Sequence, residues 1–270
     1  MNSEKAISDL VEISQYAAKH PQFVQGGGGN CSVKYLDMMV IKASGVFLED
    51  VSNKKGFVTL NIQGIKVPPE QKPHPSLETS IHLLLGKYVI HTHPIVIGAI
   101  VCAKEGKIIF KDLFKNDDCF WINYTSPGEQ LSKKIKGIIG DFDLNHNLVL
   151  LLENHGIFIS TSSKEACINL HETIIKNLET YFNYDQFNFI TESVSVNGYL
   201  TPDHIVYSTL NKQNASIKEL KAINEQDLYA KQVIALINSK KSGIKYLTNE
   251  EVNFIQTMKE EKYRQKLLKE

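Results

Sequence analysis

The sequence lacks a charge excess of either sign. Lysine plus arginine and aspartate plus glutamate each number 30 among the 270 residues, so the formal net charge is zero. Proteins that bind nucleic acid or anionic membranes usually carry a basic surface, and we therefore expect neither partner here. A small anion such as a phosphate must then be held by a local site and not by the overall charge.

Cysteines and long apolar runs are also scarce. The four cysteines lie far apart without CxxC spacing, which argues against a disulfide framework and favours reduced, buried thiols. The longest apolar stretch, residues 94–103, has about half the length that a bilayer span needs. The opening residues, MNSEKAISDLVEIS, do not have the form of a secretory signal, so we expect a cytoplasmic protein.

The remaining composition is that of an ordinary globular protein, with 42% hydrophobic and 22% charged residues. Apolar residues three and four positions apart predict helices, and short alternating or apolar runs predict strands. The predicted helices cover residues 4–19, 76–85, 94 onward, 127–136 and 163–182. The predicted strands cover residues 31–35, 38–42, 57–61, 88–93, 120–124 and 148–153.

These elements alternate without a strict βαβ repeat, and the Leu36-Asp37 turn indicates a hairpin. We therefore expect an α/β protein with a mixed or antiparallel sheet between helices. Composition turns polar and helical near residue 212, which predicts a domain over 1–211 and a helical extension over 212–270. The extension is expected to pack on its own domain or on a neighbouring subunit, and to serve assembly and not chemistry.

Two histidines stand on one predicted strand. His91 and His93 alternate around Thr92, so both rings point to the same face. Two neutral histidines at this spacing form half of a zinc site. The alternative is a pair of partly buried histidines that bond to the backbone, and an isolated HxH does not decide between the two.

A third histidine and a glutamate extend this pattern. His155 follows the apolar run 148–152, and three histidines with an open fourth position describe a catalytic zinc. Taken alone, His155 also fits a hydrogen-bonded loop residue. Glu78, in the first turn of a predicted helix, is a candidate acid/base or a carboxylate that complements the helix dipole. His82 lies on the same helix face as Glu78, and a structural role is favoured for it.

Short donor-rich turns suggest an anion site. The run from Gly26 to Gly29, followed by Asn30, can direct backbone amides toward a phosphate, although it matches no established nucleotide-binding loop. Ser44-Gly45 and Ser76 add hydroxyl and amide donors. The alternative for the glycine run is a flexible loop. Together with the histidines, these residues indicate a zinc ion beside a phosphate pocket.

The motifs GGGGNCSVK, KASG, HPSLET, HTHP and NHG, in this order, resemble the class II aldolase/adducin family over roughly residues 5–185. The resemblance implies a three-layer α/β/α sandwich with a largely antiparallel central sheet. It also implies a homotetramer with active sites between subunits. By position, it implies three zinc ligands, one acid/base and five phosphate-binding residues: His91, His93 and His155; Glu78; and Gly29, Asn30, Ser44, Gly45 and Ser76.

The second half of the chain is similar to a narrower group. The segment TPDHIVYS and the ending LTNEEVNFIQTMKEEKYRQKL resemble the aldolase-like halves of bifunctional aldolase/dehydrogenase proteins. Two departures from the family pattern occur. Leu77 stands where some members have a second serine before the glutamate. The segment IIFKDLFK has no tyrosine where fuculose-type enzymes supply one from the neighbouring subunit, so another group must protonate the aldehyde oxygen or the reaction differs.

The resemblance implies a zinc-dependent aldolase that cleaves a ketose phosphate to a three-carbon or similar keto fragment and an aldehyde. The reaction would pass through a metal-stabilised enediolate, with Glu78 moving the proton. Decarboxylation or dehydration of a sugar phosphate stays open, because the metal chemistry is shared. Glu78 argues against the related 4-epimerases, which have aspartate there. A non-catalytic adducin-like scaffold is less expected, since all metal-site residues are present. Co²⁺, Mn²⁺ or Fe²⁺ would also suit three imidazoles.

Overall fold

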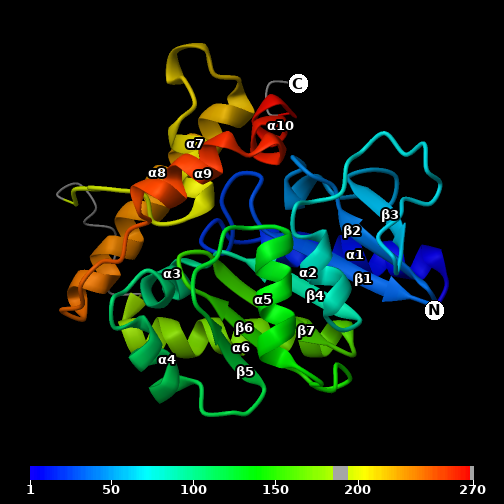
Figure 1. The fold of residues 1–270 in the computed structure, drawn as a ribbon, viewed down its shortest axis with the longest axis horizontal. Helices are drawn as coiled ribbons and strands as arrows, with labels where there is room; N and C mark the ends of the chain where they lie inside the picture. Colours follow the sequence, from blue (N-terminus) through cyan, green and yellow to red (C-terminus); the bar gives the residue numbers. More distant parts are fainter. Residues whose placement is uncertain (185–193, 268–270) are drawn as a thin grey trace.

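A computed structural model describes residues 1–184 and 194–267. One seven-stranded sheet runs through the molecule in the order β3-β2-β1-β4-β7-β6-β5 (Figure 1). Its strands are β1 (Asn30–Tyr35), β2 (Met38–Lys42), β3 (Phe57–Asn61), β4 (Tyr88–Thr92), β5 (Cys119–Ile122), β6 (Leu148–Leu152) and β7 (Gly156–Thr161). All neighbouring strands are antiparallel except β5 and β6, which are parallel. The predicted largely antiparallel sheet is confirmed.

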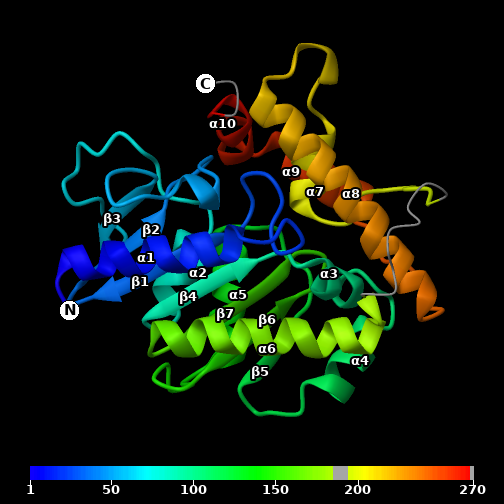
Figure 2. The ribbon, with the colours of Figure 1, turned by 180° about the vertical axis from the view of Figure 1, so that it is seen from behind.

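Helices cover both faces of this sheet, as Figures 1 and 2 show from opposite sides. One face carries α1 (Ser3–Ala18), α3 (Ile95–Val101) and α6 (Lys164–Phe182), and α4 (Gly106–Leu113) packs against α3. The other face carries α2 (Thr79–Leu84) and α5 (Glu129–Ile139). Side chains alternate accordingly: Val89 and Phe158 belong to the core under α2 and α5, whereas Ile90 and Ile159 belong to the opposite core. The predicted three-layer sandwich is confirmed.

Four further helices gather beyond one end of the sandwich in both views. They are α7 (Pro202–Ser208), α8 (Ile217–Ser239), α9 (Asn249–Thr257) and α10 (Lys259–Leu267). A short 3₁₀ turn, Lys212–Asn214, lies between α7 and α8, and another, Leu48–Asp50, lies between β2 and β3. Ala230 and Val233 of α8 share a hydrophobic core with α3 and α6. The first long helix of the extension therefore packs into the main core. The division at residue 211 stays a prediction.

The sequence patterns miss three elements and misplace the ends of others. Strand β7 and the helices α4 and α7 are not predicted. A tight turn joins β6 to β7, and Asn154 adopts a positive φ of 51° there, which is uncommon for a residue other than glycine. Helix α5 begins at Glu129 and not at Pro127, because Gly128 has a φ of 101° that no helix accommodates. Helix α2 begins at Thr79, with Glu78 as its N-cap, three residues after the predicted start.

Two expectations from composition concern the thiols and the membrane. The four cysteines are free, with Cys119 half-buried and the other three buried. In the two described ranges, every helix is too short or too polar to cross a bilayer.

Candidate metal centre and active site

The central strand β4 brings the first histidine to its end. His91 is fully buried, and its ring stacks on Phe158 of β7 with centroids 3.9 Å apart and planes 12° apart. Its Nδ1 lies 2.9 Å from the carbonyl oxygen of Ile157. A carbonyl can only accept, so His91 donates from Nδ1 and presents the lone pair of Nε2 to the site. Burial lowers the pKa of His91 to about 4, which keeps the ring neutral.

The turn between β6 and β7 fixes His155 beside this strand. Asn154 donates from Nδ2 to the carbonyl oxygens of Leu200 at 2.8 Å and Lys245 at 2.7 Å. A Cβ at Gly156 would lie 2.5 Å from the carbonyl oxygen of Thr92 and 2.6 Å from the His93 ring, so only glycine fits there. The NHG motif thus anchors the turn with asparagine, places the histidine and leaves room for His93.

Glu78 reaches the same point from the N-terminus of α2. Its Oε1 lies 3.0 Å from His91 Nε2 and 3.2 Å from His155 Nε2. Burial acts to raise the pKa of Glu78, but the neighbouring His91 and His155 hold that pKa well below its ordinary value. The carboxylate is therefore ionised within the cluster of histidines.

These groups fit a divalent metal ion. His91, His93 and His155 each offer one nitrogen, and the three atoms lie within 4.8 Å of one another. His91 Nε2 and His93 Nε2 are 3.0 Å apart. Two nitrogens bound tetrahedrally to zinc, at about 2.0–2.1 Å each, lie about 3.3 Å apart. Converging lone pairs and a carboxylate repel one another unless a cation lies between them, so the arrangement of the three predicted ligands fits a bound metal ion.

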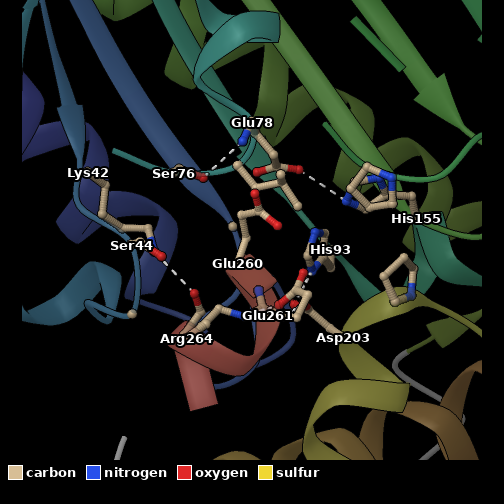
Figure 3. A pocket seen from close by; sticks show the side chains of 16 residues that line it. Lys42, Ser44, Ser76, Glu78, His93, His155, Asp203, Glu260, Glu261 and Arg264 are labelled. Atoms are coloured by element: carbon tan, nitrogen blue, oxygen red, sulfur yellow. Dashed lines mark hydrogen bonds and ion pairs between the residues drawn. The ribbon is translucent and has the colours of Figure 1, made fainter. Parts of the chain in front are cut away.

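A small cavity adjoins the histidines, and Figure 3 shows the side chains around it. Its volume is about 50 Å³. Four of the five predicted phosphate-binding residues line it: Gly29, Ser44, Gly45 and Ser76. The fifth, Asn30, begins β1 opposite His91, is 1% exposed and is not among the lining residues. Leu77, where some family members have serine, also lines the cavity.

Three backbone amides of the glycine run donate hydrogen bonds to other groups of the same chain. The amide of Gly26 donates to Glu225 at 2.6 Å, that of Gly27 to the Tyr207 hydroxyl at 2.9 Å and that of Gly28 to the Gln25 carbonyl at 3.1 Å. The expected convergence of amides on a phosphate therefore does not hold for these three glycines. Their partners show that the run joins the sandwich to α7 and α8.

One cavity residue that the sequence patterns miss is Lys42, at the end of β2. It is 2% exposed, and its Nζ donates to the carbonyl oxygens of Gly27 at 3.1 Å and Val46 at 2.7 Å. Burial lowers the pKa of Lys42 to about 8. Its place directly before the Ala43-Ser44-Gly45 motif was the available signal.

Helix α7 and the C-terminal extension supply the other missed residues. Asp203 of α7 and Glu260, Glu261 and Arg264 of α10 line the cavity, and Figure 3 shows these side chains on one side of it. A Cβ at Gly45 would overlap Leu267, so α10 lies directly over the Ser44-Gly45 turn. Helix α10 therefore forms part of the cavity wall, and the expectation that residues 212–270 serve assembly and not chemistry stays a prediction. The signal in the sequence was Arg264, the sole arginine among 29 lysines.

Two other buried histidines lie nearby but face other groups. His82 Nδ1 is 2.7 Å from the Ser32 hydroxyl, and its ring packs edge-on against Phe158. This contact agrees with the structural role favoured for His82. His171 lies on the opposite face of the sheet, 2.8 Å from the Thr92 hydroxyl.

Comparison with known proteins places this site in a family. Residues 8–182 match the class II aldolase and adducin N-terminal domain. YuxG of Bacillus subtilis, an uncharacterized oxidoreductase, is 30% identical over 217 residues, which cover 68% of this chain. The aligned region spans only 30% of that protein.

Solved structures share the fold. The N-terminal class II aldolase domain of a conserved Thermoplasma acidophilum protein has a TM-score of 0.56 and 22% identity, and the alignment covers 67% of this chain and 95% of that one. YgbL of Klebsiella pneumoniae, a putative aldolase/epimerase/decarboxylase, has a TM-score of 0.53 and 19% identity, with 68% of this chain and 91% of that one covered. An L-fuculose 1-phosphate aldolase has a TM-score of 0.51 and 20% identity, with 70% of this chain and 90% of that one covered. Since the domain match spans more than half of its residues, the chain belongs to the class II aldolase and adducin family.

Proposed function

We propose that this protein is a metal-dependent aldolase that cleaves a phosphorylated ketose into a three-carbon or similar keto fragment and an aldehyde. The observation that carries the proposal is the convergence of His91 Nε2, His93 Nε2 and the Glu78 carboxylate, with 3.0 Å between the two nitrogens. Family membership supports the reaction class, and the fold shared with an L-fuculose 1-phosphate aldolase supports the substrate class.

His91, His93 and His155 would hold one metal ion per chain, with zinc as the first candidate and cobalt, manganese or iron as others. When bound, the ion would supply Lewis-acid polarisation of the substrate carbonyl. The chain prepares the ligands for this role: the Ile157 carbonyl orients His91, and the ring stacks on Phe158. Rings fixed in this way lose little freedom when they bind a metal.

Glu78 would move the proton. Its ionised carboxylate lies among the histidines, so it can take a proton from the carbon next to the substrate carbonyl, or return one there. A positioned acid/base of this kind contributes about 10²–10⁴ in rate. The N-cap position on α2 holds the carboxylate at the edge of the cavity.

The phosphate would bind at the opposite side of the cavity, near Ser44, Gly45, Ser76 and Lys42. A local site is necessary because the chain has no net charge. The cavity of about 50 Å³ has room for a few water molecules and not for a sugar phosphate. Substrate entry would therefore require α10 to move away from Gly45, together with the carboxylates of Glu260 and Glu261.

The experiment that tests this function is incubation of the metal-loaded protein with a panel of ketose phosphates and sugar-acid phosphates. Mass analysis of the products separates carbon–carbon cleavage from loss of water or carbon dioxide, which are the dehydratase and decarboxylase alternatives. Cleavage that disappears in Glu78→Gln supports the aldolase. A protein that binds no metal and converts none of these substrates would instead match the adducin-like scaffold. We also propose a cytoplasmic location and, as the family resemblance implies, a homotetramer.

A further inference from the structure

The side of His93 that faces away from the metal site meets a buried ion-pair cluster. His93 Nδ1 lies 3.2 Å from Asp203 Oδ2, and Asp203 Oδ1 lies 2.6 Å from Arg264. Arg264 Nε is also 2.8 Å from Glu261. We infer that Asp203 is a positioning residue for the metal ligand His93 and that Arg264 holds Asp203 in place. This inference rests on the proposed metal site.

The two ligands of the HTH motif are oriented by different means. His91 lies within β4, so the backbone of the neighbouring β7 provides the Ile157 carbonyl for its Nδ1. His93 follows the end of β4 at Thr92, and its backbone amide already leaves the sheet to bond with Phe23. A side chain from another element must then orient its ring. Asp203 does this from α7.

A carboxylate in this position has a specific effect on a metal-binding histidine. Its negative charge beside Nδ1 favours the tautomer that carries the proton there, which leaves the Nε2 lone pair directed at His91 and the metal site. Loss of such a partner typically weakens metal binding about 10–100-fold. The family match ends at residue 182, so the segment that contains Asp203 lies outside it.

Arginine is the residue that this cluster needs. Asp203 is 5% exposed, and a buried carboxylate requires a partner with opposite charge. Arg264 contacts Asp203 through Nη2 and Glu261 through Nε, so one planar guanidinium joins two carboxylates at once. A lysine presents a single ammonium and cannot reproduce this fork. The chain has 29 lysines and one arginine, and the arginine stands here.

The glycine run provides the space for this contact. A Cβ at Gly28 would overlap the Asp203 carboxylate and lie 3.2 Å from His93 Nδ1. Gly28 does not have a positive φ, and the shortest contact of the added Cβ is with Asp203, followed by the Gln25 carbonyl oxygen at 3.0 Å. The substitution therefore displaces Asp203 from His93 without changing either residue.

The test is the dissociation constant for Zn²⁺, measured by competition with a chelator on the full chain. Asp203→Asn should weaken binding about 10–100-fold, and Gly28→Ala and Arg264→Lys should weaken it in the same direction. Asp227→Asn is the matched control, because Asp227 belongs to an exposed pair with Lys212 in the same extension. Its affinity for Zn²⁺ should equal that of the wild type.

A double variant separates positioning from general destabilisation. If Arg264 acts through Asp203, Arg264→Lys should have no further effect on Zn²⁺ affinity in the Asp203→Asn background. Absorption spectra of the Co²⁺ forms report the ligand geometry and should change in Asp203→Asn but not in Asp227→Asn.

The outcomes are distinguishable. The inference would be overturned if Gly28→Ala, Arg264→Lys and, where it folds, Asp203→Asn all bound Zn²⁺ with wild-type affinity, even if their thermal stability fell. A wild type that binds no metal would instead overturn the proposed function.

Discussion

Buried histidines lie on both faces of the sheet beside Thr92, and they differ in what their rings face. His91 and His93 are directed at each other and, for His91, at the Glu78 carboxylate. His171 lies on the other face of the sheet, between the hydroxyls of Thr92 at 2.8 Å and Tyr16 at 2.9 Å. Thr92 stands between the two ligands in the sequence, so successive residues of one strand serve the site and the core.

The comparison shows that burial alone does not identify a ligand. Burial lowers the pKa of His171 to about 3 and that of His91 to about 4, so both rings are neutral. A hydroxyl can donate or accept, and each nitrogen of His171 is satisfied in either tautomer. The ligand histidines instead face carbonyl and carboxylate oxygens, which can only accept hydrogen bonds. Converging acceptors require a cation, whereas hydroxyl partners complete a structural network.

The largest expected effect is loss of the metal in His93→Ala. This variant removes one of three nitrogen ligands and should bind little Zn²⁺ and lose catalysis while remaining folded. His171→Gln should retain the metal, because Gln can still bond to Thr92 or Tyr16. It should lose about 1–3 kcal/mol of stability for imperfectly paired hydroxyls. Metal analysis and chemical denaturation of both variants measure the difference. Equal metal content in His93→Ala and wild type would remove the basis of the comparison.

The next largest effect is expected at Glu78, whose carboxylate lies beside His91 and His155. Glu78→Gln keeps the size of the side chain and removes proton transfer, so turnover should fall about 10²–10⁴-fold. The three histidines remain, and most of the metal should stay bound. Glu129→Gln, at an exposed carboxylate in α5, serves as the control and should keep full activity. Turnover close to wild type in Glu78→Gln would show that another group moves the proton.

A smaller effect is expected at the anion side of the cavity. Ser44→Ala removes a hydroxyl from the cavity, and a hydrogen bond to a charged group contributes about 1.5–3 kcal/mol. The KM for a phosphorylated substrate should rise about tenfold or more, on the scale of about 1.4 kcal/mol per factor of ten. The unphosphorylated sugar is the control, since its KM should not change. An equal change for both sugars would place the phosphate elsewhere.

The site could be predicted from sequence where the chemistry lies in short motifs. HTH at a strand end and NHG after an apolar run identify three histidines whose backbones the sheet brings together. Asp203 and Arg264 could not be found in this way, because their pairing spans 61 residues and depends on how α10 returns over the cavity. The glycine run suggested anion binding, but the amides of Gly26 and Gly27 bond to Glu225 and Tyr207, which become close only after folding.

The fold shows the same limit. Periodicity located α1, α6 and most strands, because their apolar spacing is set by local geometry. It missed β7, which is apolar and short and follows the turn directly, so no flanking break separates it from a loop. It also placed the start of α2 at Ser76, where a serine resembles a cap. In the structure the Ser76 hydroxyl instead accepts a hydrogen bond from the backbone amide of Glu78 at 3.2 Å, just before the helix begins.

The smallest expected effect is a change in acid sensitivity at His171, and it sharpens the contrast between the two groups. Burial lowers the pKa of His171 from 6.5 to about 3 in the folded protein. Between these two values the unfolded chain binds the extra proton, so this residue's contribution to stability is fully present above pH 6.5. It is lost as the pH falls toward 3. The slope from one such group is at most about 1.4 kcal/mol per pH unit.

His171→Gln does not titrate in this range and should show a correspondingly shallower loss of stability with acid. Carboxylates elsewhere in the protein also titrate there, so the quantity to compare is the difference between the two curves. Denaturant unfolding of metal-free protein at pH values from 4 to 8 measures that difference while keeping metal release out of the result. The gap between wild type and variant should narrow on acidification. A gap that stays constant with pH would mean that His171 is protonated as readily in the folded protein as in the unfolded chain, and that burial does not hold it neutral.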